Sequence, residues 1–203
     1  ATLLEPERDL VIKGPKTRAS KTFKDLYKNK EDDQVVLTEV EYYVHNKMCN
    51  SALENPTCKK ILNDSRRVTE SSVFVTDKTT GLNLKTRPDL YIAETGHLYD
   101  IKTTIDASPK GFAEQVGKYM YHVQAAFYVL TCKKAGLKAT DFSFIAVEKT
   151  APYIAHLHKV SPELLKEATE KVEETLAYIA EANKTGVFGT GWGEYSTLKV
   201  GDF

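Results

Sequence analysis

The sequence lacks the features that mark several protein classes. It has three cysteines, Cys49, Cys58 and Cys132, an odd and widely spaced set that forms neither a disulfide framework nor a CxxC metal knuckle. No apolar run approaches the roughly 18 to 20 residues of a membrane span. The glycine-rich tail after Gly186 lacks the GK[ST] ending of a phosphate-binding loop. We therefore expect a protein of the reducing cytoplasm with no membrane span.

The chain also lacks a net charge, because 28 Lys and Arg balance 28 Asp and Glu. This balance argues against a protein that coats nucleic acid, but it permits an enzyme that confines positive charge to one groove. The 203 residues predict one domain over 1–203. Residue 1 is Ala, so we expect an upstream segment to be missing.

The hydrophobic period changes along the chain and predicts an α/β (α+β) fold, with a central mixed sheet flanked by helices. We expect a charged surface arm before residue 36 and an irregular tail from residue 186. The expected helices cover about 23–27, 38–56, 58–62, 108–134 and 161–183. The expected strands cover 68–75, 81–86, 141–149 and 153–160, with a further hairpin over 87–104.

The hairpin reads "RPDLYIAETGHLYDIKTT" and contains residues that are poor strand formers. A two-residue turn at Thr95-Gly96 would place Asp89 opposite Lys102 and diagonal to Asp100. One face would then be apolar and the other would carry Tyr91 with the three charged residues. An odd-length loop would slip the register and turn Asp89 to the apolar face. The sequence therefore predicts a charged cluster on one side of the hairpin.

Two carboxylates within a few Å of each other repel, and a hard divalent cation relieves that repulsion. Mg²⁺ and Mn²⁺ prefer carboxylate, backbone carbonyl and phosphate oxygens. Lys102 would orient or deprotonate a water and offset charge on a phosphate. The alternative is a salt bridge on a solvated sheet face, worth less than about 1 kcal/mol. Because Pro88 fixes the backbone before Asp89, we favour the phosphodiester-cleaving site.

The long helix that follows has a polar stripe at Gly117, Tyr121, Gln124 and Tyr128, spaced four, three and four residues apart. Glutamine can hold a phosphate or a base edge, and tyrosine rings can stack on bases. The alternative is an ordinary helix surface with amphipathic tyrosines. Taken alone, the stripe is more typical of that ordinary helix surface.

These segments together resemble the PD-(D/E)xK nuclease superfamily. "RPD" (87–89), "DIK" (100–102) and "QAAFY" (124–128) are similar to its metal-binding Asp, its D/E-x-K element and the Q-x-x-x-Y motif of the RecB-like branch. "LLEPER", "TESSVFVTDKTTGLNLKTRPD" and "FIAVEKTAPY" resemble the nuclease domain of exodeoxyribonuclease VIII, the RecE-type phage recombination exonucleases. The resemblance covers most of residues 1–160 in order.

The resemblance implies an Mg²⁺- or Mn²⁺-dependent exonuclease that degrades one strand of duplex DNA from the 5′ end. The 3′ overhang would pass to a single-strand annealing protein, and family members form rings around the duplex. Two competing functions remain: a related endonuclease, and a catalytically silent DNA-binding or interaction module on the same fold. Three unclustered cysteines exclude the iron–sulfur variant of the RecB-like branch.

The resemblance also implies roles for particular residues. Asp89 and Asp100 would bind the metal together with the Ile101 carbonyl, and Lys102 would handle the attacking water. Glu70, in "VTESS", would touch a second metal or its water, or else is a plain exposed strand residue. The family histidine lies just upstream of "LLEPE", before this chain begins. Four further residues would contact or support the DNA: Arg87, Tyr121, Gln124 and Tyr128.

Overall fold

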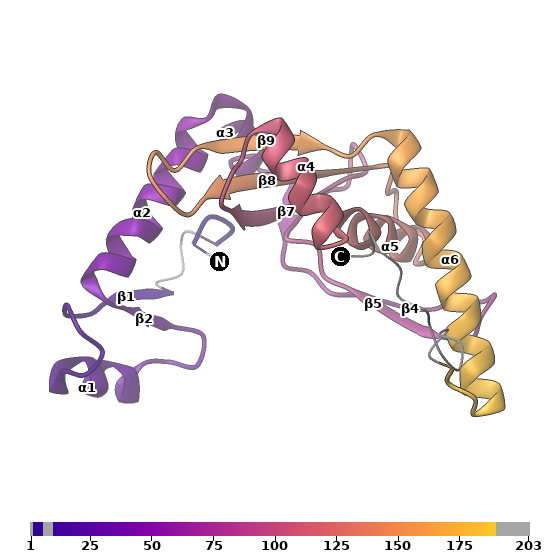
Figure 1. Cartoon of the computed structure of the whole chain (residues 1–203), viewed down its shortest axis with the longest axis horizontal. Helices are drawn as coiled ribbons and strands as arrows, with labels where there is room; N and C mark the ends of the chain where they lie inside the picture. Colours follow the sequence, from indigo (N-terminus) through magenta and orange to yellow (C-terminus); the bar gives the residue numbers. More distant parts are fainter. Residues whose placement is uncertain (1, 6–9, 190–203) are drawn as a thin grey trace, which may run out of the picture.

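The computed structural model describes residues 2–5 and 10–189. Its centre is a five-stranded sheet in the order β3-β6-β7-β8-β9 (Figure 1). Only the β7–β8 pair is parallel; the other three pairs are antiparallel. The strand bounds are Arg67–Thr69 (β3), Leu90–Ile92 (β6), His97–Thr104 (β7), Asp141–Glu148 (β8) and Ala155–Lys159 (β9). The predicted central mixed sheet is therefore confirmed.

Helices cover both faces of this sheet. On one face α2 (Glu39–Glu54) and α3 (Pro56–Leu62) enclose a core that includes Cys58, Leu62 and Ile145. On the other face α4 (Pro109–Lys118), α5 (Tyr121–Lys134) and α6 (Pro162–Thr185) enclose a second core that includes Leu98 and Phe144. Because β7 and β8 are covered on both sides, even the side of β7 that carries Asp100 is largely buried.

Two smaller ribbons extend from this body. The parallel pair β1 (Val11–Lys13) and β2 (Val35–Leu37), with α1 (Lys21–Asn29) between them in sequence, forms what we call the arm, residues 10–37. The antiparallel pair β4 (Val73–Thr76) and β5 (Asn83–Thr86) forms the second ribbon. Figure 1 shows the arm at one end of the molecule, and the β4–β5 ribbon with α6 at the other.

The helix starts follow the capping signals in the sequence. Thr38 forms a reciprocal capping box with Glu41 at the start of α2. Ser108 and Ser161 each cap a helix that has proline in its first turn. The short helix expected near Phe23 is present as α1, with Ser20 as its N-cap. These predictions are confirmed.

Two predicted elements are each divided by a residue in the left-handed region. The strand expected over 68–75 breaks at Glu70, which has φ of 50°, so β3 joins the central sheet whereas β4 pairs with β5. The helix expected over 108–134 breaks at Met120, where φ is 56°. The irregular tail was predicted from residue 186; Gly186 caps α6, and residues 190–203 lie outside the described residues.

The register of the β6–β7 hairpin differs from the prediction. Ile92 pairs with His97 and Leu90 pairs with Tyr99, so the loop has four residues, 93–96, and Asp89 is not opposite Lys102. Gly96, with φ of 76°, donates its N–H to the Ile92 carbonyl at 2.9 Å, which closes the longer loop. The slide of two residues leaves Leu90 and Ile92 in the core on one face and Asp100 and Lys102 on the other. Asp89, in contrast, lines a cavity together with Ile101, a residue of the predicted apolar face.

No helix in the described part of the chain is both long enough and apolar enough to cross a bilayer.

Candidate active site

The predicted acids and lysine meet beside the middle of β7. Asp89 immediately precedes β6, and its Oδ2 accepts a hydrogen bond from the Ile101 N–H at 2.7 Å. Asp100 Oδ1 accepts from Gln124 Nε2 on α5 at 2.8 Å, and Asp100 Oδ2 lies 2.6 Å from Lys102 Nζ. Asp100 is only 4% exposed. The alternative of a salt bridge on a solvated sheet face is therefore wrong, since α5 covers that face.

Both carboxyls are held in surroundings that disfavour their charged forms. Burial raises the pKa of Asp89, and the nearby charge of Asp100 raises it further. Burial also raises the pKa of Asp100, although Lys102 and Gln124 act in the opposite direction. Glu70 adds a further negative charge that raises the pKa of Asp100. Asp100 therefore interacts electrostatically with both Asp89 and Glu70, and each interaction is a repulsion between negative charges.

The donor set fits a hard divalent cation. Asp100 Oδ2 is buried and makes no hydrogen bond of acceptable geometry, although the Lys102 ammonium is close to it. Asp89 supplies a second carboxylate, and the Ile101 backbone lies between Asp100 and Lys102. Among the described residues, no three His, Cys, Asp or Glu side chains form a complete ligand group. A site with two carboxylates and few other protein ligands suits Mg²⁺ or Mn²⁺, because these ions keep several waters and bind substrate phosphate.

Two residues of α5 hold the other side of the site. Gln124 orients the Asp100 carboxylate through the hydrogen bond described above. The Lys102 ammonium lies 4.8 Å from the centroid of the Tyr121 ring, a cation–π contact that keeps the half-buried lysine extended toward Asp100. The structure therefore brings Tyr121 and Gln124 next to Lys102 and Asp100, and their contact with DNA stays a prediction.

The remaining predicted residues occupy different positions. Glu70 is at the rim of the site and pairs with Arg87 at 2.5 Å; the Arg87 Nε also donates to the Glu70 carbonyl at 2.9 Å. Arg87 therefore restrains Glu70, and its contact with DNA stays a prediction. Tyr128 is one turn beyond Gln124 and packs edge-on against Phe142, with 6.2 Å between ring centroids. Its role in DNA binding likewise stays a prediction.

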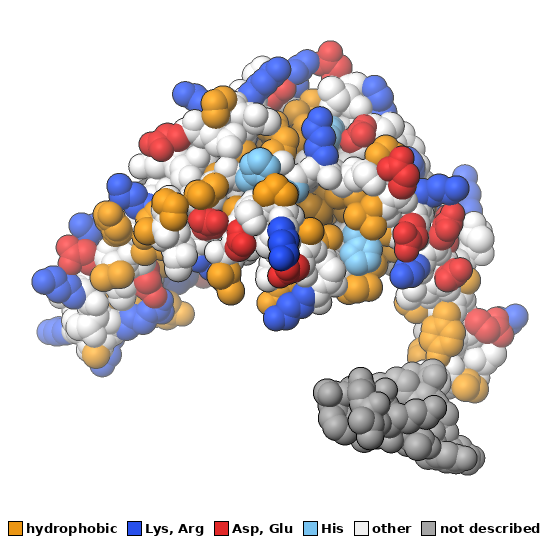
Figure 2. Space-filling model, turned by 45° about the horizontal axis from the view of Figure 1, so that its top comes forward, with side chains coloured by type: hydrophobic (Ala, Val, Ile, Leu, Met, Phe, Trp, Pro, Cys, Tyr) orange, Lys and Arg blue, Asp and Glu red, His pale blue; other side chains and the backbone are white. Residues whose placement is uncertain are grey.

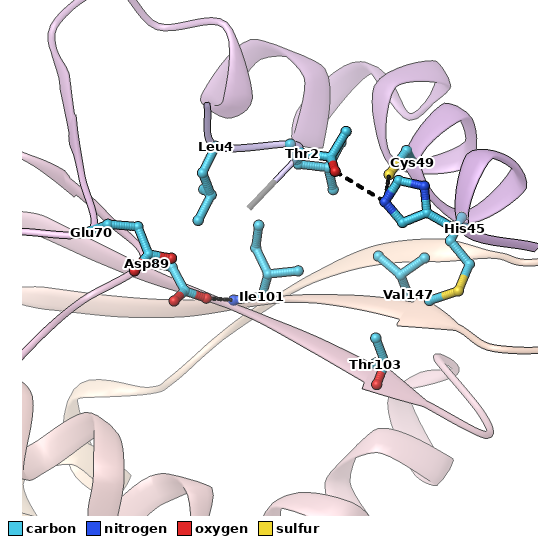
Figure 3. Close-up of a pocket in the computed structure, with 11 residues that line it drawn as sticks. Thr2, Leu4, His45, Cys49, Glu70, Asp89, Ile101, Thr103 and Val147 are labelled. Atoms are coloured by element: carbon cyan, nitrogen blue, oxygen red, sulfur yellow. Dashed lines mark hydrogen bonds between the residues drawn. The ribbon is translucent and has the colours of Figure 1, made fainter. Parts of the chain in front are cut away.

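A cavity of about 240 Å³ opens beside Asp89 and extends toward α2. Figure 3 shows Glu70 and Asp89 at one end of it and His45 at the other, with Ile101 and Thr103 between them. The His45 Nε2 lies 3.1 Å from Thr2 Oγ1 and 3.6 Å from Cys49 Sγ. Sequence reasoning did not place His45 near the acids, because helix α2 carries no motif that relates it to β7.

One of the solved structures similar to this chain shares its fold, with a TM-score of 0.60. No curated protein matches the sequence. A crystal structure from Eubacterium rectale that bears the name "Putative exonuclease" is 17% identical, with a TM-score of 0.60, and the match covers 81% of this chain and 61% of that one. The structure of SSO0001 is 12% identical with a TM-score of 0.39, over 75% of this chain and 72% of that one.

A protein-family model matches residues 3–198, a span that includes Asp89, Asp100, Lys102 and Gln124. Because it extends over nearly the whole chain, the match establishes the family and agrees with the mixed sheet and the D-x-K element on β7. The chain belongs to the family of the PDDEXK-like domain of unknown function (DUF3799).

Proposed function

We propose that the chain is a divalent-metal-dependent exonuclease acting on duplex DNA. The observation that carries the proposal is the convergence of Asp89, Asp100 and Lys102 beside one sheet strand, with Gln124 fixing the Asp100 carboxylate. A carboxylate pair with an adjacent ammonium group is suited to phosphodiester hydrolysis. The name of the Eubacterium rectale protein, which shares the fold, supports the same class of reaction.

Asp89, Asp100 and the Ile101 carbonyl would hold the cation. When bound, Mg²⁺ or Mn²⁺ would supply the positive charge that acidifies an attacking water and stabilises charge on the phosphate. As an ammonium group, Lys102 would orient the attacking water or donate a hydrogen bond to a phosphate oxygen as negative charge develops. It would accept the proton of that water only in its neutral amine form. Gln124 keeps Asp100 from rotating away. In the proposed reaction water attacks the phosphate directly, so no covalent intermediate with the protein forms.

The distribution of charge supports a polyanionic substrate. Residues 13–30 contain six Lys, one Arg and a single Asp, although the whole chain is neutral. Lys13 and Arg18 pair with Glu39 and Glu41 of α2, whereas the lysines of α1 are exposed. Figure 2 shows blue Lys and Arg side chains gathered at the end of the arm. This segregation is the electrostatic pattern of a nucleic-acid-binding surface.

The finer features of the proposal rest on the resemblance to RecE-type exonucleases. We propose that the enzyme degrades the 5′-ended strand, assembles as a ring around the duplex, and leaves a 3′ overhang for a single-strand annealing protein. Two of these features have direct measurements: end-labelled substrates report polarity, and sedimentation velocity reports the assembly.

The central test compares linear and covalently closed circular duplex DNA in the presence of Mg²⁺ or Mn²⁺. An exonuclease degrades the linear form and leaves the closed circle intact, whereas an endonuclease also cuts the circle. Asp100→Ala and Lys102→Ala should each abolish degradation, while Glu167→Ala and Lys166→Ala, exposed on α6, should not. Degradation that survives both active-site substitutions would overturn the assignment. Binding without degradation by the wild type would instead favour the silent module.

A further inference from the structure

A second cavity lies on the other side of the β7 end from the acidic one. Its volume is about 140 Å³, and Thr103 lines both cavities. The lining combines polar groups, a cation and aromatic rings: Thr103, Thr104, Gln115, Tyr119, Tyr121 and Lys149. Tyr121 is also the ring that contacts the Lys102 ammonium. The two cavities therefore meet at Thr103, near the end of β7.

The break between α4 and α5 forms one wall of the second cavity. Met120 has φ of 56°, a left-handed conformation that is unfavourable for a non-glycine residue. Tyr119, just before it, is 53% exposed. Its ring stacks on Tyr121, with 5.6 Å between the centroids and 26° between the planes. The break thus holds an aromatic ring at the mouth of a polar cavity instead of continuing the helix.

The surface around this mouth is unusually apolar for a solvent-facing position. Ile105, which is 72% exposed, itself lines the cavity. Met120, which is 49% exposed, lies in sequence between the lining residues Tyr119 and Tyr121. Scattered exposed apolar side chains need no explanation, but a group that borders a polar cavity marks a contact surface. Two cations are close: Lys149 in the lining, and Lys118, whose Nζ is 5.4 Å from the Tyr119 centroid.

We propose that this cavity is a subsite for the nucleotide next to the scissile phosphate, whose base stacks on Tyr119. An exposed aromatic ring with nearby lysines is the sequence-tolerant way in which proteins bind single strands. The cavity is smaller than the roughly 300–1,000 Å³ that encloses a whole small ligand. It therefore receives the sugar or phosphate, held by Lys149 and Gln115, while the base remains outside on Tyr119. The proposal rests on the proposed cleavage at Asp89 and Asp100.

Two measurements test the subsite. In the first, oligonucleotides carry 2-aminopurine at the first, second or third position from the 5′ end, and the protein is kept metal-free with EDTA so that no cleavage occurs. Stacking quenches the probe fluorescence. We expect one position to be quenched by the wild type and by Tyr119→Trp, but not by Tyr119→Ala. Tyr178→Ala is the matched control, because Tyr178 is 54% exposed on α6.

In the second, steady-state degradation of linear duplex separates KM from kcat. A lost base stack is worth about 1–3 kcal/mol, so Tyr119→Ala should raise KM about 5- to 150-fold with kcat little changed, and Tyr119→Phe should restore KM. Lys149→Gln should raise KM and weaken its salt dependence, while Lys166→Gln should do neither. Unchanged KM and unchanged quenching in Tyr119→Ala would refute the subsite, even if Lys102→Ala abolished cleavage. A wild type that quenches the probe but never cleaves would instead refute the proposed function.

Discussion

Replacement of Asp89 by Asn should stabilise the metal-free protein while it abolishes nuclease activity. Asp89 is disfavoured as an anion by burial and by the charge of Asp100, and its hydrogen bond comes from the Ile101 N–H at 2.7 Å. An Asn side-chain oxygen can accept that same hydrogen bond, so the substitution removes repulsion without orphaning the donor. Relief of strain at an active site is typically worth about 1 kcal/mol. For a domain of this size that raises Tm by about 2–4 °C.

The divalent cation should reverse this order of stabilities. A ligand at a hundred times its Kd stabilises the folded state by about 2.7 kcal/mol, so Mn²⁺ should raise the Tm of the wild type well above that of Asp89→Asn. The assay is thermal unfolding of both proteins in EDTA and across a Mn²⁺ titration, with Glu167→Gln as the control. Two results would refute the reasoning: a variant less stable than the wild type in EDTA, or equal stabilisation of both proteins by Mn²⁺.

Three further predictions concern the support of the site, the arm and the response to pH. Gln124→Leu removes the only amide bound to Asp100 Oδ1 in the described chain, so kcat/KM should fall about 10- to 100-fold with the far-UV circular dichroism unchanged; full activity would contradict this role. Substitution of Lys21, Lys24 and Lys28 of α1 by Gln should weaken duplex binding and reduce the salt slope by up to about three, measured by fluorescence anisotropy, whereas the same change at Lys166, Lys171 and Lys184 of α6 should not. Burial lowers the pKa of both His97 and His158, so the folded state binds protons less readily than the unfolded state. The free energy of unfolding should therefore be fully present above about pH 6.5 and fall as the pH decreases below it. Urea titrations at pH 7 and pH 5 should show this loss, and His158→Gln, which retains a donor for the Ala107 carbonyl, should reduce it.

Local chemistry made several parts of the fold predictable from the sequence. Ser and Thr caps with a following proline or glutamate mark helix starts through short-range hydrogen bonds, and Thr38, Ser108 and Ser161 all follow that rule. The alternation of the hairpin placed Asp100 and Lys102 on one face, and this survived an incorrect register. A slide of two residues changes the partner of each residue but not its face.

The register itself and the two breaks were not predictable, because they depend on contacts far apart in sequence. Glu70 takes its left-handed conformation where β3 must end against Asp89, whose carbonyl accepts the Glu70 N–H. Met120 has no side-chain signal for a helix break. The preference of a single residue is worth about 1 kcal/mol, so packing against the sheet readily overrides it.

The amino-acid pattern alone indicated which residues form the candidate site: two aspartates, a lysine and a glutamine, with Asp100 and Lys102 two positions apart on one strand. The side-chain period of a strand or helix is a property of its backbone, so the sequence alone shows which residues of one element share a face. Only the tertiary structure decided what surrounds the cluster. It buried Asp100 under α5, set Arg87 against Glu70, brought His45 from α2 to the same cavity and turned Tyr119 outward at the helix break. These arrangements arise from packing between segments tens of residues apart, which no local pattern records.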